Sequence, residues 1–136
     1  MLIEWNACLE TGVFEIDYDH KRLIALANAI SLAATRREVD VAVLAREFCN
    51  YCDDHFVMEE VFMKEISYPW YQEHKADHDF LLVDLDRIMA KVKLNPEVLT
   101  VVPDFINSWT ANHVLVVERK LAEFVRARAC SDGLGI

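Results

Sequence analysis

The sequence has little glycine, little proline and little positive charge. Its 136 residues include only three glycines and three prolines, which leaves few breaks for long loops and argues against disorder. Lysine and arginine number 14 against 23 aspartates and glutamates, so the formal net charge is −9. An acidic chain repels the phosphates of nucleic acids and of anionic membrane surfaces. We therefore expect neither nucleic acid nor a membrane as a partner.

Long apolar runs and an export signal are also lacking. The longest apolar stretch, residues 23–34, is interrupted by Asn28 and Ser31, whereas a membrane-spanning helix needs about 20 apolar residues. The opening MLIEWN has neither the basic segment nor the apolar core of a signal peptide. We expect a cytoplasmic protein.

Cysteine occurs four times, without the spacing of a zinc finger. Cys49 and Cys52 form a CxxC pair, but no second pair follows at a suitable distance. Because no export signal is present, we interpret all four cysteines as reduced thiols. We expect Cys49 and Cys52 to be small core-facing residues of a helix.

Four segments have the three- and four-residue apolar spacing that predicts helices. They cover approximately residues 19–37, 41–65, a segment from Pro69, and a last one that opens at Pro96 or Pro103. Strand signals are weak, and no Asn-Gly or Asp-Gly hairpin turn occurs. Helices of about 20 residues joined by short loops pack as antiparallel neighbours. The sequence predicts an all-α fold, an up-down-up-down antiparallel four-helix bundle.

The chain length fits one domain, and no repeat or change of composition divides it. We expect residues 1–136 to form a single domain. Residues 1–18 are predicted to be an N-terminal extended arm, and residues 129–136 a tail or linker stub.

All five histidines lie on the apolar stripes of these helices, and every helix carries at least one. They are joined by Glu59, one turn after His55; the other histidines are His20, His74, His78 and His113. Buried imidazoles and carboxylates need partners, which are other polar groups or a metal. A single inward histidine is usually bonded to a backbone carbonyl, and a structural zinc site closes at four ligands. Five imidazoles with a carboxylate instead suit two ions of iron, copper or zinc.

Four motifs carry a resemblance to a known family: TGVFEIDYDHKRL, HFVMEEVFM, YPWYQEHKADHDF and WTANHVLVVE. Together they resemble the hemerythrin family, specifically the bacterial hemerythrin (bacteriohemerythrin) domain, from Trp5 to about Ala127. The resemblance implies a non-haem protein that binds dioxygen reversibly at two iron ions, in an oxo- or hydroxo-bridged di-iron centre. It implies one iron held by His74, His78 and His113, a second held by His20 and His55, and Glu59 as a bridge.

The resemblance also indicates the residues around the oxygen site. An oxygen pocket would be lined by Leu23, Phe56, Trp109 and Val114, which would slow the entry of water and protons. Glu60, beside Glu59, is interpreted as a solvated charge.

Position 118 departs from the family pattern. The family usually has an aspartate five residues after its last histidine ligand, where this sequence has Glu118. On a regular helix, five residues separate Glu118 from His113 by about 140°, and a π-type bulge would bring the two into line. Leu121 and Val125 continue the stripe from Glu118, which supports such a shift. We predict that Glu118 is a metal ligand, either bridging both irons or binding one.

Within this reading, oxygen sensing, oxygen transport or delivery, and storage or detoxification are all open. The alternative is a di-iron oxidase or peroxidase, or a redox sensor that reacts irreversibly with oxygen or peroxide. Such enzymes usually carry four carboxylates with two Glu-x-x-His motifs, which this sequence lacks, so we expect a binding protein and not an enzyme. Plain iron or zinc storage, or a structural metal bundle, is a third class. Besides dioxygen, the resemblance suggests a signalling partner or a fused output domain.

Overall fold

The computed structural model describes residues 2–36 and 41–131. Within these ranges every regular element is helical. The elements are, in order, the 3₁₀ turn η1 (Ala7–Leu9), α1 (Phe14–Arg36), α2 (Val41–Glu65), α3 (Tyr71–Leu94), the 3₁₀ turn η2 (Pro96–Val101), α4 (Val102–Asn112), the π-helix η3 (His113–Glu118) and α5 (Arg119–Ser131).

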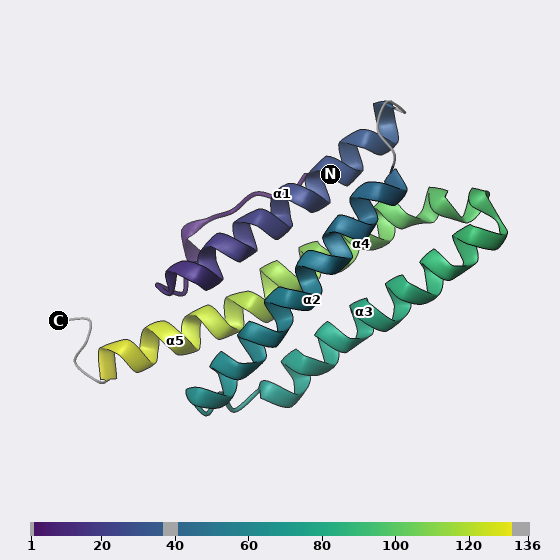
Figure 1. Cartoon of the computed structure of the whole chain (residues 1–136). Coiled ribbons are helices and arrows are strands. Elements are labelled where there is room, and N and C mark those ends of the chain that lie inside the picture. Colours follow the sequence, from purple (N-terminus) through teal and green to yellow (C-terminus); the bar gives the residue numbers. More distant parts are fainter. Residues whose placement is uncertain (1, 37–40, 132–136) are drawn as a thin grey trace.

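The helices form four rods that lie side by side. In Figure 1, α1, α2 and α3 are the first three rods, and α4, η3 and α5 run on as one continuous fourth rod. Consecutive rods run in opposite directions, and α1 packs against both α2 and α4 while α2 packs against α3. The predicted all-α, up-down-up-down four-helix bundle is confirmed. The sequence left two openings for the last rod, and both prolines mark a start: η2 begins at Pro96, and Pro103 lies in the first turn of α4.

The arm is shorter than the predicted residues 1–18, because α1 begins at Phe14. The Asp17 carboxylate accepts hydrogen bonds from the backbone N–H groups of Thr11 (2.9 Å) and Gly12 (3.1 Å) and from the Thr11 hydroxyl (2.8 Å). Gly12 has a φ of 85°, which glycine adopts without strain. This turn fixes the entry into the helix, and an acidic side chain in the first turn is favoured by the helix dipole.

The extended arm runs back along α1 (Figure 1). The backbone of Ile3 exchanges two hydrogen bonds of 2.9 Å with the Asn28 side chain, and the Ile3 side chain is buried. At the other end, α5 continues through Ser131, so the predicted tail from residue 129 begins three residues too early. Neither glycine nor proline interrupts the helix there. Residues 132–136 of the predicted tail lie outside the described part.

The link from α2 to α3 is a tight chain reversal. The Tyr68 N–H donates to the Met63 carbonyl (2.9 Å) and the Ser67 N–H to the Lys64 carbonyl (3.1 Å), with Ser67 in the left-handed region at a φ of 55°. This hydrogen-bond pair is the Schellman ending of a helix. It turns the chain so that the first residues of α3 pack back against the end of α2.

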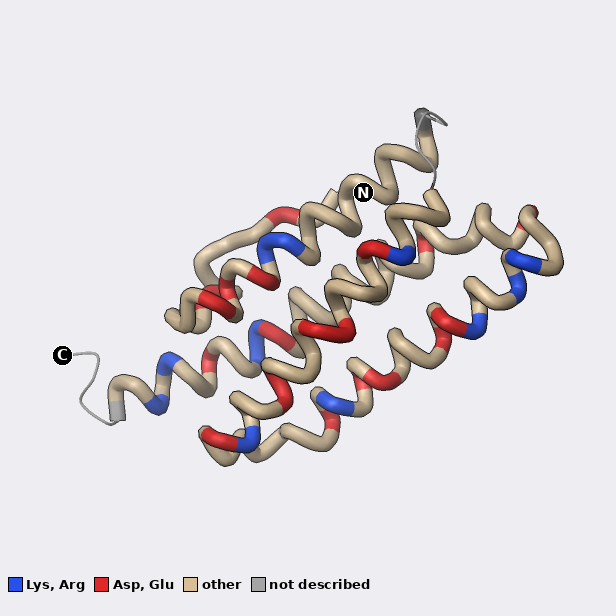
Figure 2. Tube along the Cα trace, viewed as in Figure 1, with Lys and Arg blue, Asp and Glu red and all other residues tan. Residues whose placement is uncertain are grey.

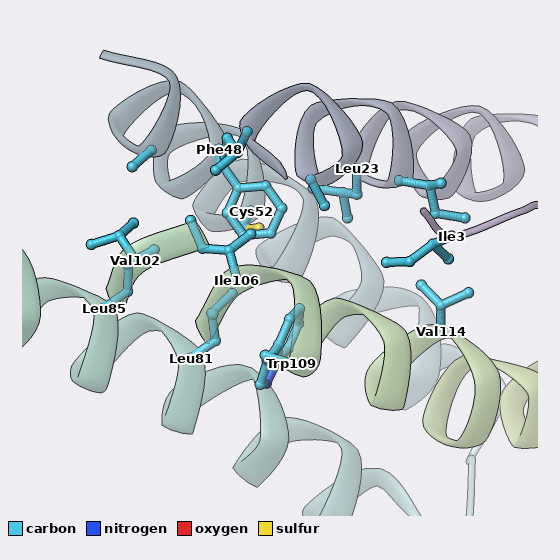
Figure 3. Close-up of a cluster of buried hydrophobic side chains, with 14 of the residues drawn as sticks. Ile3, Leu23, Phe48, Cys52, Leu81, Leu85, Val102, Ile106, Trp109 and Val114 are labelled. Atoms are coloured by element: carbon cyan, nitrogen blue, oxygen red, sulfur yellow. The ribbon is translucent and has the colours of Figure 1, made fainter. Parts of the chain in front are cut away.

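The apolar core fills the bundle beside the polar cluster described below. In Figure 3, the side chains of Phe48, Cys52, Leu81, Leu85 and Ile106 lie together, from α2, α3 and α4. Cys52 is fully buried, and Cys49 is half-buried. All four cysteines are free thiols, so the interpretation of the CxxC pair as packing residues agrees with the structure.

Charged residues are spread along the rods (Figure 2), and acidic residues outnumber basic ones in the sequence. Among the described helices, none combines the length and the apolar character that crossing a membrane would require.

Candidate metal centre

Seven polar side chains meet at the centre of the bundle, and each is at most 2% exposed. They are His20 from α1, His55 and Glu59 from α2, His74 and His78 from α3, and His113 and Glu118 from η3. These are the seven ligands predicted from the sequence, and the structure brings all of them together. Their inward direction follows from helix geometry, since the pairs in α2 and α3 are four residues apart.

Glu59 directs its two oxygens to different histidines. Its Oε2 lies 2.7 Å from Nε2 of His20 and 3.3 Å from Nε2 of His55. Its Oε1 lies 2.8 Å from Nε2 of His74 and 3.1 Å from Nε2 of His78. The carboxylate therefore stands between the histidines of α1 and α2 on one side and those of α3 on the other.

Glu118 repeats this division from the opposite rod. Its Oε2 lies 3.1 Å from Nε2 of His20, and its Oε1 lies 3.1 Å from Nε2 of His74 and 2.5 Å from Nε2 of His113. Two groups result, which we name the three-histidine group (His74, His78 and His113) and the two-histidine group (His20 and His55). Each group, taken with both glutamates, has one ligand atom per residue within 4.8 Å of all the others.

The π-helix η3 explains how Glu118 reaches the cluster. It runs from His113 to Glu118, and its wider turn brings residues five apart onto one face. Both side chains are buried, and Leu121 continues the buried face into α5. The predicted π-type bulge between these two positions is confirmed.

Three carboxylates lie behind the histidine rings and contact the Nδ1 atoms. Nδ1 of His55 lies 2.9 Å from Asp19 Oδ2, and Nδ1 of His113 lies 2.5 Å from Asp77 Oδ2. An ionised carboxylate can only accept, so each Nδ1 carries a proton and donates it, and each Nε2 faces the cluster. This orientation is the one that metal-binding histidines need.

The third carboxylate behind a ring is that of Glu60, which the sequence analysis interprets as a solvated charge. Glu60 is not simply solvated, because its Oε2 lies 2.9 Å from Nδ1 of His78. The sequence analysis also missed Asp19 and Asp77. A signal did exist, since each of the three is adjacent in sequence to a cluster residue. However, all three act on a histidine of another helix, which spacing within one helix does not reveal.

Burial and the neighbouring charges shift the pKa values of the residues in the cluster. Burial lowers the pKa of His74, but the charges of Glu118 and Glu59 raise it more, to about 10. For His55, burial is likewise outweighed by Glu59 and Asp19, and the pKa rises to about 9. Burial raises the pKa of Glu59, but the neighbouring histidines bring it well below its ordinary value. The pKa of His78 is lowered, mainly by burial.

Several ligand atoms are close together without being hydrogen-bonded. Four ligand atoms are buried and have no hydrogen-bond partner among the described residues: His55 Nε2, His78 Nε2, Glu59 Oε1 and Glu118 Oε2. Each nevertheless lies within 3.3 Å of a histidine nitrogen or a carboxylate oxygen of the cluster. Close approach without hydrogen-bond alignment is expected of atoms that converge on a common centre. Imidazole and carboxylate donors suit transition metals, so the residues fit a metal site.

Aromatic rings cover the three-histidine group. Phe56 stacks on His78 with ring centroids 3.8 Å apart, and Trp109 stacks on His113 at 4.4 Å. Leu23 and Val114 belong to the same buried apolar cluster (Figure 3). The role of these four residues as an oxygen pocket stays a prediction.

Comparisons with known proteins agree with this site. The family model described as the hemerythrin HHE cation binding domain matches residues 11–125. A protein named Bacteriohemerythrin from Stenotrophomonas maltophilia (strain R551-3) is 25% identical over 127 residues, which cover 93% of this chain and 83% of the relative. Proteins of the same name from Pseudomonas aeruginosa (strain LESB58) and Campylobacter jejuni subsp. jejuni are also similar. The first is 25% identical, covering 81% of this chain and 72% of the relative. The second is 29% identical, covering 71% and 77%.

The matched region contains all seven residues of the cluster, from His20 to Glu118. With a helical bundle, a central group of histidines and glutamates and a family match over most of its length, the chain belongs to the hemerythrin HHE cation binding domain family.

Proposed function

We propose that this chain is a non-haem di-iron protein that binds dioxygen reversibly. The observation that carries the proposal is the division of the two carboxylates, since Glu59 and Glu118 each direct one oxygen to each histidine group. Carboxylates arranged in this way are suited to bridge two ions. The name of the relatives, Bacteriohemerythrin, supports the same conclusion.

The two histidine groups would hold one iron each, with both glutamates as bridges. Iron bound there would supply the reversible redox chemistry by which dioxygen is taken up and released. With the glutamates counted on both sides, the three-histidine group offers five donors and the two-histidine group four. The side with fewer protein donors is where an exogenous ligand has room, so we assign dioxygen binding to the His20 and His55 side.

The surrounding residues hold the ligands and exclude water. Asp19, Glu60 and Asp77 fix the orientation of three rings through Nδ1. The rings of Phe56 and Trp109 cover the histidines with apolar surface. A dry, apolar surrounding restricts the entry of water and protons, which favours reversible binding over irreversible oxidation.

The ligand set argues against the oxidase or peroxidase alternative. Two carboxylates and five histidines line the cluster, whereas oxygen-activating di-iron bundles usually offer four carboxylates. Within oxygen binding, we favour sensing over delivery or storage, because Glu118 is longer than the family's usual aspartate and makes a less rigid bridge.

The test is metal analysis combined with a visible spectrum. We expect two iron ions per chain in protein produced with added iron, and a visible absorption band that appears in air and disappears when oxygen is removed. One ion or none per chain would contradict the di-iron assignment. A spectrum that changes once and does not return would favour the irreversible alternative.

A further inference from the structure

A small pocket opens beside the cluster, between α3 and the π-helix. Its volume is about 150 Å³, and it is lined by Tyr68, Trp70, Glu73, His74, Val116, Val117 and Lys120. His74 is the one lining residue that belongs to the metal cluster, and Val116 and Val117 belong to η3. A volume of this size exceeds what a single water needs and suits a molecule of a few atoms.

His74, which lines this pocket, has an unsatisfied polar atom. Its ring is 1% exposed, and its Nε2 is directed at Glu59 and Glu118. Its Nδ1 is buried and has no hydrogen-bond partner among the described residues. With Nε2 directed at the cluster, Nδ1 carries a proton and is the donor of this ring that is left without an acceptor.

The other histidines indicate what kind of group belongs at this atom. Nδ1 of His55, His78 and His113 each contacts a carboxylate that the chain itself supplies. No described carboxylate contacts Nδ1 of His74, and His74 lines the pocket. His20 Nδ1 is also unpartnered, but His20 does not line this pocket.

Two positive features beside the pocket favour a small anion. The Lys120 ammonium lies 4.1 Å from the centre of the Trp70 ring, and no described carboxylate forms an ion pair with it. The first turn of the 24-residue helix α3 adds the positive end of a helix dipole, and its N-cap residue Trp70 provides no side-chain cap. Glu73 also lines the pocket and opposes an anion, although its side chain is exposed to solvent.

We propose that this pocket binds a small monocarboxylate, of the size of formate or acetate, which accepts a hydrogen bond from His74 Nδ1 and pairs with Lys120. The bound carboxylate takes the place that Asp19, Glu60 and Asp77 hold behind the other rings. An acceptor at Nδ1 makes Nε2 a better metal ligand. By reciprocity, the anion and the metal tighten each other's binding.

The experiment titrates formate into the full-length chain at constant ionic strength, with chloride as the control anion. Calorimetry on the iron-loaded protein measures affinity, and the ¹⁵N shift of His74 Nδ1 in the metal-free protein locates the ligand. We expect saturable binding in the millimolar range, which suits a ligand of three heavy atoms, and a shift at His74. Binding that does not saturate, an unmoved His74 signal, or equal binding of chloride overturns the proposal.

Three charge variants test the assignment of the residues. Lys120→Met retains the aliphatic stem over Trp70 and is expected to weaken formate binding about tenfold. The matched control is Lys64→Met, because the Lys64 ammonium also lies over a ring, 5.3 Å from the centre of Tyr71, but does not line the pocket. It should stay within about twofold of the parent. Glu73→Gln should tighten binding.

Equal losses in the two lysine variants would mean general surface electrostatics and would overturn the proposal. The outcome is separate from that of the proposed function. Formate binding in the metal-free chain does not require iron, and reversible oxygen binding does not require the pocket.

Discussion

The two histidine groups share both glutamates but differ in what lies behind and over their rings. In the three-histidine group, His78 and His113 have carboxylates at Nδ1 and aromatic rings stacked on their faces. In the two-histidine group, only His55 has a described carboxylate at Nδ1, which is that of Asp19. The difference indicates that one side of the cluster is built to hold its ligands fixed, while the other tolerates a change of ligand.

Asp19 itself links the two-histidine group to the rim of the bundle. The Tyr51 hydroxyl donates to Asp19 Oδ1 at 2.6 Å, while Asp19 Oδ2 lies at His55. On the other side, Trp109 both stacks on His113 and donates through its indole N–H to the Asp77 carbonyl at 3.3 Å. Each group therefore depends on a different aromatic residue for the position of its supporting carboxylate.

The largest effect is expected from removing a ligand of the fixed side. His78→Ala should lose metal and also destabilise the fold, because metal binding energy is partly folding energy. Metal analysis and thermal unfolding with and without iron provide the measurement. His55→Ala is the matched variant of the other group and should cost less. Equal melting temperatures of metal-free and metal-loaded parent protein would contradict this account.

A change at Glu118 tests the bridge between the groups. Glu118→Ala should lose an iron or shorten the lifetime of the oxygen adduct, because it removes an oxygen from each group. Glu118→Asp, the family's usual residue, should lengthen that lifetime by restoring a more rigid bridge. Stopped-flow absorbance and iron content measure both. If both variants match the parent, Glu118 is not a ligand.

The supporting carboxylates should matter less than the ligands. Asp77→Asn is expected to weaken metal affinity by about 10–100-fold, since it removes the charged acceptor behind His113. Asp19→Asn should have a smaller effect, as Asp19 supports the more adaptable group. Competition with a chelator measures both affinities. Asp84→Asn, which breaks only an exposed pair with Arg87, is the control, and a loss there of similar size would refute the assignment.

Protons should compete with metal in both groups. The pKa values of His74, about 10, and His55, about 9, lie above the ordinary value of 6.5, so the metal-free protein holds these protons at neutral pH. Metal must displace them. Apparent affinity should therefore rise with pH between about 6.5 and 9, by up to about tenfold per pH unit for each proton released. Titration calorimetry in buffers of different ionisation enthalpy counts the protons, and no net release would contradict the prediction.

The smallest effect is expected at the cysteines, which belong to neither group. Changing Cys49 and Cys52 to serine or alanine should leave oxygen binding within a small factor of the parent. Cys52 lies in the apolar core and is fully buried, so serine there should lower stability more than alanine does. Loss of the iron spectrum with the fold intact would show that the thiols take part in the site.

Much of the cluster could be predicted because its signals lie within single helices. His55 and Glu59, or His74 and His78, are one turn apart, so apolar spacing alone predicts that they point inward. The family's aspartate position drew attention to Glu118, and the spacing of five then required a π-helix. The residues that escaped prediction depend on packing between helices. Asp19 and Asp77 are each 36 residues from their histidine, and only the assembled bundle pairs them.

The start of α1 escaped prediction for a related reason. The turn before it is held by Asp17 accepting from residues five and six positions earlier, which is not the usual capping pattern. The apolar spacing therefore predicts this helix only from about residue 19, since its apolar stripe begins at His20.

The π-helix also sets the rotational phase of everything that follows it. If the same residues wound as ordinary α-helix, Glu118 and every residue after it would turn by about 100° about the helix axis. Leu121 and Ala122, now fully buried, would turn away from the core, while the backbone up to His113 would stay in place. The extra residue in η3 thus sets the rotation of α5 relative to α4 about the axis of the rod that they share. The six residues of η3 carry both His113 and Glu118. A local change of helical winding at the cluster would therefore rotate α5 about its axis.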